Sequence, residues 1–254
     1  MDAPKDVVGR ASRLLRELAR AEPAGATTSA LARAVGLARP TAHRLLVSLL
    51  DNGLAERVRE TDRWVLGPEA YLLGAAAAAR YDVTNMAHRH VRALAQATAE
   101  GAFFSVRRGD ETVCLIREDG AFPLRSHVLH EGVRFPLGVA SAGMAILAHL
   151  PDRDVDDYLR RTDLTGEFGP QHATDHVRSH IEQTRRAGYA VNPGLIVEGS
   201  WGMAAAVFDG DGRPQWALTL TGVAHRFSDD RRPELGAMLL REAHALTTAL
   251  RTRP

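Results

Sequence analysis

Apolar residues recur at helical spacing in three segments near the start of the chain. Residues 7–21 carry valine, leucine or alanine at every third or fourth position, which predicts an amphipathic helix that ends before Pro23. A second helix is expected to begin with Thr28 as its N-cap and to stop at Gly36. A third helix follows with Pro40 in its first turn, where the missing amide hydrogen costs nothing. Its apolar face is predicted to comprise Ala42, Leu45, Leu46, Leu49 and Leu50.

The other face of the third helix carries side chains that donate hydrogen bonds, and no acidic residue occurs between Glu22 and Asp51. Residues 54–59 and 64–66 then predict two short strands of a basic hairpin. This order is typical of a winged helix-turn-helix, in which the second helix of the helix-turn-helix lies in the major groove of DNA. A small helical domain with a solvated polar face is the alternative. The residues predicted to contact double-stranded DNA are Thr28, Arg39, Pro40, Thr41, His43, Arg44, Ser48, Arg59 and Arg63.

Residues 66–99 predict a helical connection with an alanine run at 75–79 and a candidate break at 82–85. The apolar side chains of Tyr71 and Leu72 need a partner to cover them, so we expect a homodimer or a dimer of dimers. Two-fold symmetry in the protein predicts a pseudo-palindromic operator. The predicted organisation is a DNA-binding domain at 1–68, a helical linker at 69–99, and a C-terminal domain at 100–254 to which the resemblance to a known family, given below, assigns effector binding and oligomerisation.

Beyond residue 100 the pattern changes to short strands mixed with helices. Strands are predicted at 103–107, 112–118, 124–129, 189–192, 203–208 and 215–221. Helices are predicted at 141–150, 154–161, 174–187 and 229–251, the first of them with Ser141 as its N-cap. These alternating elements predict an α+β domain with a mostly antiparallel sheet.

The composition of the 254 residues, with 45% hydrophobic and 25% charged side chains, excludes a disordered or collagen-like protein. Residues 1–80 hold 12 basic and 9 acidic side chains, a net charge of +3, and the remaining 20 basic and 22 acidic side chains give −2. The longest apolar stretch, residues 71–79, is about half of the roughly 20 residues that a membrane helix needs. Without a secretory leader, and with Cys114 as the single cysteine, we expect a cytoplasmic protein with no disulfide and no membrane partner.

Five segments in the order found here resemble the IclR family of bacterial transcription regulators. They are residues 30–54, 64–74, 132–150, 185–192 and 198–222, of which the last reads EGSWGMAAAVFDGDGRPQWALTLTG. The resemblance covers nearly the whole chain. It implies a winged helix-turn-helix followed by an effector-binding domain related to the GAF fold, and a regulator whose affinity for DNA responds to a small organic molecule.

The resemblance also implies where the effector binds, between the loop before residue 141 and the strands that follow Gly199. The positions that match are Leu137, Gly138, Val139, Ala140, Ser141, Ala142, Leu195, Trp201, Gly202, Met203, Thr219 and Thr221. Many family members carry an acidic residue where Leu195 stands and a cysteine where Gly202 stands. The loss of both polar groups predicts an apolar or aromatic effector, with a carboxylate held by backbone amides at the start of the helix.

The sequence offers little support for an enzyme. Ser141 lies in a segment close to a nucleophile elbow, but Val139 stands where that turn requires glycine. Cys114 is typical of a small buried apolar residue, and no histidine pair has a third ligand at metal-binding spacing. No phosphate loop or dinucleotide motif occurs, so we expect no catalytic residue, metal or cofactor. The alternative function is a winged-helix protein whose C-terminal domain mediates protein contacts without a ligand.

Overall fold

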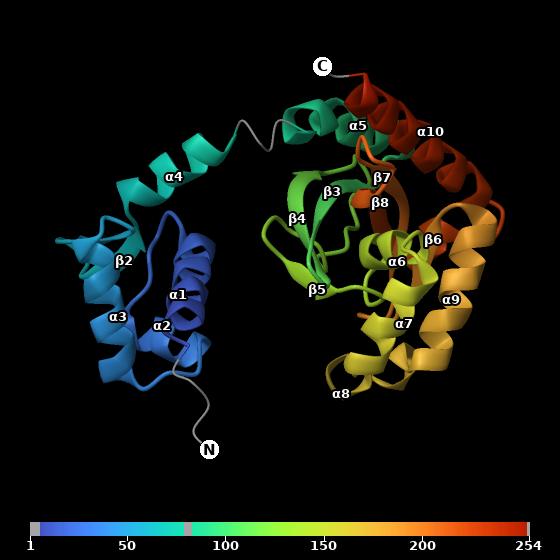
Figure 1. The fold of residues 1–254 in the computed structure, drawn as a ribbon. Helices are drawn as coiled ribbons and strands as arrows, with labels where there is room; N and C mark the ends of the chain where they lie inside the picture. Colours follow the sequence, from blue (N-terminus) through green and yellow to red (C-terminus); the bar gives the residue numbers. More distant parts are fainter. Residues whose placement is uncertain (1–5, 79–82, 253–254) are drawn as a thin grey trace. The chain divides into compact units, whose positions relative to one another are not determined.

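The chain divides into two units, Met1–Tyr81 and Asp82–Pro254, in the computed structural model, which describes residues 6–78 and 83–252 (Figure 1). The N-terminal unit has the predicted order of helices and hairpin. Its elements are α1 (Val7–Ala21), α2 (Thr28–Ala34), α3 (Arg39–Asp51), β1 (Ala55–Val58), β2 (Arg63–Leu66) and α4 (Pro68–Ala78). The two strands pair antiparallel, with Ala55 opposite Leu66. This arrangement confirms the winged helix-turn-helix.

The core of the N-terminal unit is built around Trp64, which is completely buried. Its indole Nε1–H donates to the Thr28 hydroxyl at 2.9 Å. The apolar side chains that surround Trp64 come from α1, α2 and α3. Thr27, and not Thr28, is the N-cap of α2, because its hydroxyl accepts from the Ala30 amide at 3.2 Å while the Thr28 hydroxyl faces the core. The prediction of Thr28 as the cap was therefore wrong by one residue.

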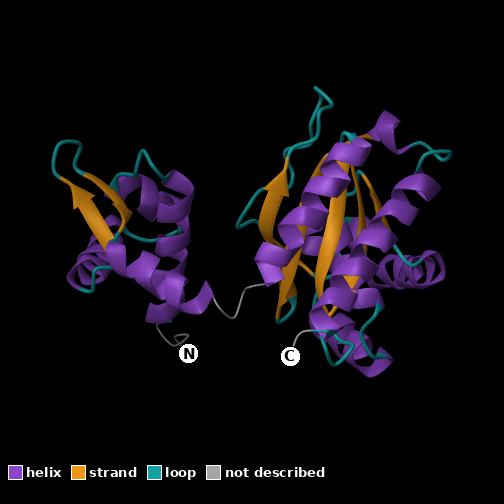
Figure 2. Cartoon of the chain, turned by 90° about the horizontal axis from the view of Figure 1, so that it is seen from above, coloured by secondary structure: helices purple, strands orange, loops and turns teal. Residues whose placement is uncertain are grey.

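The C-terminal unit is an α+β domain, as predicted, with a six-stranded antiparallel sheet in the order β5-β4-β3-β8-β7-β6 (Figure 2). The strands are β3 (Gly101–Arg108), β4 (Glu111–Glu118), β5 (Arg134–Pro136), β6 (Ala190–Pro193), β7 (Ser200–Phe208) and β8 (Pro214–Val223). The helices are α5 (Val83–Thr98), α6 (Ser141–Ala148), α7 (Asp152–Arg161), α8 (Thr165–Phe168), α9 (Thr174–Ala187) and α10 (Arg232–Arg251), with short 3₁₀ turns at Pro170–His172 and Ala224–Phe227.

The alternation of side chains along the central strands assigns a different core to each face of the sheet. On β7, Met203, Ala205 and Val207 pack with α5 and α10. Ala204 and Ala206 point the other way and pack with α6 and α9. Small side chains on this second face allow α6 to approach the sheet closely, and every residue of α6 is buried.

Three sequence predictions about the C-terminal half were wrong. Residues 124–129 form no strand, because the Phe122 amide donates to the Ala99 carbonyl at 3.0 Å and leads the chain across the end of the sheet. The helix α5 packs within the C-terminal unit and does not belong to a separate linker, since one side of it is buried against α10 and the sheet. The N-cap of α6 is Ala140, so Ser141 is the first helical residue and its hydroxyl makes no capping bond.

Candidate functional site

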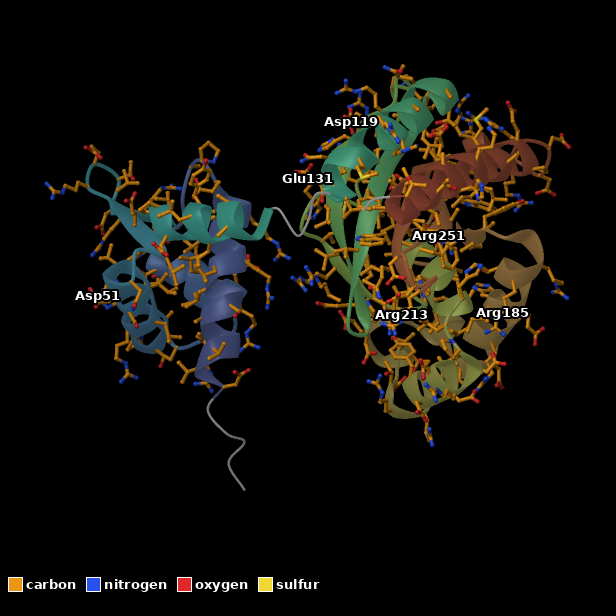
Figure 3. All side chains as sticks on the ribbon, turned by 45° about the horizontal axis from the view of Figure 1, so that its top comes forward. Asp51, Asp119, Glu131, Arg185, Arg213 and Arg251 are labelled. Atoms are coloured by element: carbon orange, nitrogen blue, oxygen red, sulfur yellow. The ribbon has the colours of Figure 1, made fainter. Side chains whose placement is uncertain are left out.

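The exposed face of α3 carries Pro40, Arg44 and Ser48, which are four residues apart and so lie along one line of the helix. Arg39 and Arg44 are both exposed. The ion pairs found within residues 6–78 are Arg20–Glu17 and Arg57–Asp62, so neither of these α3 guanidinium groups has an acidic partner there. Asp51, the acidic residue of this helix, stands at its C-terminal end (Figure 3). The N-terminal part of α3 therefore presents two unneutralised cations.

The turn between α2 and α3 orients α3 so that the face with Pro40, Arg44 and Ser48 is exposed to solvent. Gly36 has a φ of 66°, the left-handed conformation that ends α2, and the Leu37 amide donates to the Ala32 carbonyl at 2.9 Å. The opposite side of α3 is anchored in the core by Ala42, Leu46 and Leu49. The buried stripe is narrower than predicted, since Leu45 is half-buried and Leu50 is 38% exposed.

Three of the predicted DNA-contact residues have side-chain contacts within the domain. The Thr28 hydroxyl accepts from Trp64, and the Arg63 guanidinium donates to the Gly25 carbonyl at 3.0 Å. The His43 ring is exposed and packs edge-on to the Trp64 ring, with centroids 6.4 Å apart, while Thr41 is half-buried. Thr28 and Arg63 thus join the parts of the winged domain, because Gly25 lies in the turn between α1 and α2. Arg59 stands exposed in the turn between β1 and β2.

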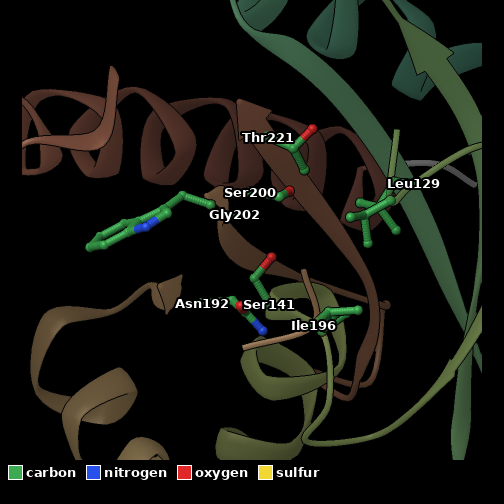
Figure 4. A pocket seen from close by; sticks show the side chains of 10 residues that line it. Leu129, Ser141, Asn192, Ile196, Ser200, Gly202 and Thr221 are labelled. Atoms are coloured by element: carbon green, nitrogen blue, oxygen red, sulfur yellow. The ribbon is translucent and has the colours of Figure 1, made fainter. Parts of the chain in front are cut away.

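A pocket in the C-terminal domain lies where the N-terminal end of α6 meets β7 and β8 (Figure 4). Two further segments close it, residues 119–133, which we term the strap, and the turn after β6. The residues that line the pocket are Val128, Leu129, Ala140, Ser141, Asn192, Ile196, Ser200, Trp201, Gly202 and Thr221. The cavity is about 20 Å³, which is water-sized, and no charged side chain of the described residues lines it.

Hydroxyl and amide groups set the polar character of this pocket. Asn192 joins two of its walls, because its Nδ2 donates to the Val139 carbonyl at 2.8 Å and its Oδ1 accepts from the Leu195 amide at 2.9 Å. The Thr221 hydroxyl is buried and has no hydrogen-bond partner, and the same holds for Thr219, two residues earlier on β8. Space beside Ser141 exists because residue 202 is glycine; a Cβ there would lie 3.0 Å from the Ser141 hydroxyl.

The structure brings five of the twelve predicted effector residues to the lining of the pocket: Ala140, Ser141, Trp201, Gly202 and Thr221. The others lie behind it or outside it. Leu137, Gly138, Val139 and Ala142 are buried beside α6, and Met203 packs on the opposite face of the sheet with α5 and α10. Leu195 is half-buried outside the lining, and the Trp201 ring lies 5.3 Å from the guanidinium carbon of Arg232, on α10.

Five of the lining residues lie outside the twelve predicted effector positions: Val128, Leu129, Asn192, Ile196 and Ser200. Asn192 is the last residue of the segment 185–192 and of the strand predicted at 189–192, so a polar residue at the end of a strand was the available signal. Nothing local marks Val128 and Leu129, because the strap reaches the pocket only through the tertiary fold.

The geometry supports neither a cysteine nucleophile nor a metal site among the described residues. Burial raises the pKa of the Cys114 thiol to about 12, so this residue is a poor nucleophile. The described residues contain no group of three or more His, Cys, Asp or Glu side chains placed to bind a metal. Among the same residues, no helix has the length and hydrophobicity needed to span a membrane.

A winged helix-turn-helix with an unneutralised basic helix, joined to an α+β domain with a pocket, is the architecture of a transcription regulator. Comparison with protein families agrees. The IclR helix-turn-helix domain matches residues 7–59, and the C-terminal domain of the bacterial transcriptional regulator IclR matches residues 75–248. The chain belongs to the IclR family of bacterial transcriptional regulators. It is a DNA-binding regulator and not an enzyme.

Relatives are similar over almost the entire chain. The transcriptional repressor IclR of Escherichia coli is 29% identical over 94% of this chain and 88% of its own length. The HTH-type transcriptional regulator BhcR of Paracoccus denitrificans is 28% identical over 90% and 82%. The crystal structure of an IclR homologue from Microbacterium hydrocarbonoxydans, complexed with 4-hydroxybenzoate, has a TM-score of 0.77 at 23% identity and covers 98% of this chain and 100% of that one. These likenesses agree with the fold described above.

Proposed function

We propose that a small organic effector binds in the pocket at the start of α6 and changes the affinity of the protein for operator DNA. The observation that carries the proposal is the Thr221 hydroxyl, which is buried without a partner at the wall of an otherwise mostly apolar pocket. An unsatisfied buried hydroxyl costs about 1–3 kcal/mol, so a ligand that hydrogen-bonds to it recovers free energy that the empty protein lacks. A pure packing role for this region does not require such a group.

The lining favours an effector with an apolar or aromatic body and few polar groups. Val128, Leu129 and Ile196 supply apolar surface, whereas the polar groups are the neutral side chains of Ser141, Asn192, Ser200 and Thr221. A single carboxylate is compatible with this set, because the N-terminal amides of α6 offer donors without a charged side chain. The IclR homologue complexed with 4-hydroxybenzoate supports a small aromatic acid as the effector.

DNA recognition is assigned to the exposed face of α3 and to the turn of the hairpin. Arg39 and Arg44 supply cations, Ser48 supplies a hydroxyl, and Pro40 and Thr41 lie in the same first turns of the helix. Arg59 is exposed in the hairpin turn and is expected to contact a backbone phosphate, and His43 lies at the margin of the face beside Trp64. Thr28 and Arg63 hold the winged domain together and are not part of this proposal.

We expect the protein to be at least a homodimer that binds a pseudo-palindrome. On α4, Tyr71 is 76% exposed and Leu72 is 56% exposed, and these large apolar side chains form the kind of surface that a partner covers. Light scattering at micromolar concentration should give a dimer or a dimer of dimers, and footprinting should show two half-sites. Leu72→Asp should shift the assembly toward the monomer. A wild-type monomer that protects one half-site would contradict this prediction.

The effector proposal is tested by filling the space beside Ser141. Gly202→Leu places a side chain where ligand is expected, so it should abolish the thermal shift that the ligand gives the wild type. Wild-type protein is first screened by thermal shift against small carboxylic acids, beginning with 4-hydroxybenzoate, because a ligand that binds only the folded state raises the melting temperature. At a ligand concentration of 100 Kd the added stability is about 2.7 kcal/mol.

Gly210→Leu is the matched control, since Gly210 is an exposed turn residue with no heavy atom near the position of an added Cβ. It should retain the thermal shift of the wild type. If Gly202→Leu responds to the ligand as the wild type does, the pocket assignment fails. If no compound stabilises the wild type, the alternative of a C-terminal domain that mediates protein contacts is favoured.

A further inference from the structure

The strap, residues 119–133, connects two places in the C-terminal domain. Near its C-terminal end, Val128 and Leu129 line the effector pocket, and the Ser126 hydroxyl lies 2.6 Å from the Ser200 hydroxyl on β7. Near its N-terminal end, the Phe122 ring lies 4.5 Å from the guanidinium carbon of Arg226. Both ends are tied to the backbone, by the Phe122 amide to Ala99 and by the Gly132 amide to Cys114 at 2.8 Å. Its middle is held by side chains.

Arg226 is part of an ionic cluster around the buried Glu100 at the end of α5. Glu100 is only 1% exposed, and its Oε1 accepts from Arg226 at 2.7 Å and from Arg231 at 2.6 Å. Both guanidinium groups also donate to the carbonyl of Thr98, the last residue of α5, at 3.3 and 2.6 Å. The arginines therefore fasten the C-terminal end of α5 to the segment that follows β8.

The same cluster contacts the strand that carries the pocket hydroxyl. A Cβ at Gly222 would collide with the Glu100 carboxylate and the Phe227 ring, so this glycine lets β8 pass directly beside the buried acid. Thr221 precedes it on β8 and lines the pocket. The pocket and the end of α5 are thus joined by two routes, through β8 and through the strap.

We infer that ligand binding in the pocket changes the structure at the end of α5. This coupling runs through the strap, its residue Phe122 and the Glu100–Arg226–Arg231 cluster. This inference rests on the proposed function. An apolar cavity of about 150 Å³ holds benzene, whereas the pocket measures about 20 Å³, so an effector with an aromatic ring must displace a wall. The strap is the wall of the pocket whose middle part is held in place only by side-chain contacts. When its displacement also breaks the bond from the Phe122 amide to Ala99, it withdraws Phe122 from Arg226 and loosens the bonds from Arg226 to Thr98 and Glu100.

The consequence for DNA binding follows from chain connectivity. Helix α5 is the first element of the C-terminal unit, and the chain leads from its N-terminal end into the DNA-binding unit. A ligand changes an equilibrium only by its different affinities for two states, and here the states differ in whether the strap is docked on Arg226. Phe122 and Arg226 are then positioning residues that touch no DNA.

Hydrogen exchange on the full-length protein without ligand tests the coupling. Phe122→Ala should raise exchange by about fivefold, the scale of one lost cation–π contact, both in the strap and in residues 94–101 at the end of α5. Arg226→Ala should do the same, and Arg226→Lys should restore part of the protection. Leu124→Ala is the matched control, because Leu124 is an exposed apolar residue of the same strap, and it should leave residues 94–101 unchanged. An increase confined to the strap would overturn the inference.

A second experiment distinguishes coupling between the pocket and DNA binding from a simple loss of rigidity in the strap. With 4-hydroxybenzoate, or whichever acid the thermal-shift screen selects, Phe122→Ala should bind the ligand within about threefold of the wild-type affinity while its operator affinity no longer changes. Ligand binding together with a wild-type DNA response in Phe122→Ala overturns the coupling. Failure of every acid to bind the wild type refutes the proposed function instead, and the exchange of residues 94–101 still decides the inference.

Discussion

Replacing Trp64 with alanine is expected to unfold the N-terminal domain and abolish operator binding while the C-terminal domain keeps its structure. Trp64 is completely buried at the centre of the winged domain, and its indole nitrogen holds the Thr28 hydroxyl at 2.9 Å. Truncation of a buried tryptophan to alanine costs about 3–5 kcal/mol. Whole domains are stable by only about 5–15 kcal/mol, and small ones lie at the lower end of that range.

Thermal unfolding followed by circular dichroism should show this loss as a transition confined to the smaller domain. Trp64→Phe is the graded variant, because it keeps most of the apolar volume but removes the hydrogen bond to Thr28. It should lower stability by about 1 kcal/mol and retain operator binding. Trp216→Ala, in the C-terminal unit, is the reciprocal control and should leave the DNA-binding domain folded. Full operator affinity in Trp64→Ala would refute the assignment of this core.

Arg44→Ala is expected to weaken binding to the operator by about 1–3 kcal/mol, which is roughly a 5- to 150-fold loss of affinity. Arg44 lies in the middle of the exposed face of α3, and within residues 6–78 no acidic side chain pairs with it. A free guanidinium on the second helix of a helix-turn-helix is positioned to contact a base edge with two hydrogen bonds. Fluorescence anisotropy at fixed salt measures the change.

Two further variants distinguish base recognition from phosphate attraction. Arg44→Lys keeps the charge but cannot make bidentate hydrogen bonds. It should therefore bind random DNA like the wild type and bind the operator more weakly than the wild type. Arg16→Ala removes a comparable exposed charge from α1 and should change operator affinity little. If Arg44→Ala binds the operator with wild-type affinity at the same salt concentration, the proposed DNA-facing side of α3 is wrong.

Local pattern predicted well those features that depend on neighbours in the chain. The helices at Val7–Ala21 and Arg39–Asp51 and the hairpin were predicted because helical periodicity, Pro40 and Gly36 act within a few residues. The same locality explains the errors. Leu50 fits the apolar stripe by spacing, but the core ends before it. Residues 124–129 form no strand, because the bond from the Phe122 amide to Ala99 leads the chain away from the sheet.

The sequence by itself determined the two-part organisation, the winged domain and the basic face of α3, since one helix has only one side left once its apolar side is buried. Only the tertiary structure decided the composition of the pocket, because its walls come from the strap, β6 and the turn after it, α6, β7 and β8, which are far apart along the chain. It also decided that Thr28 and Arg63 hold the domain together and that Glu100 anchors the end of α5. Contacts of this kind depend on which segments, distant in the sequence, pack together, and local periodicity does not indicate which ones do.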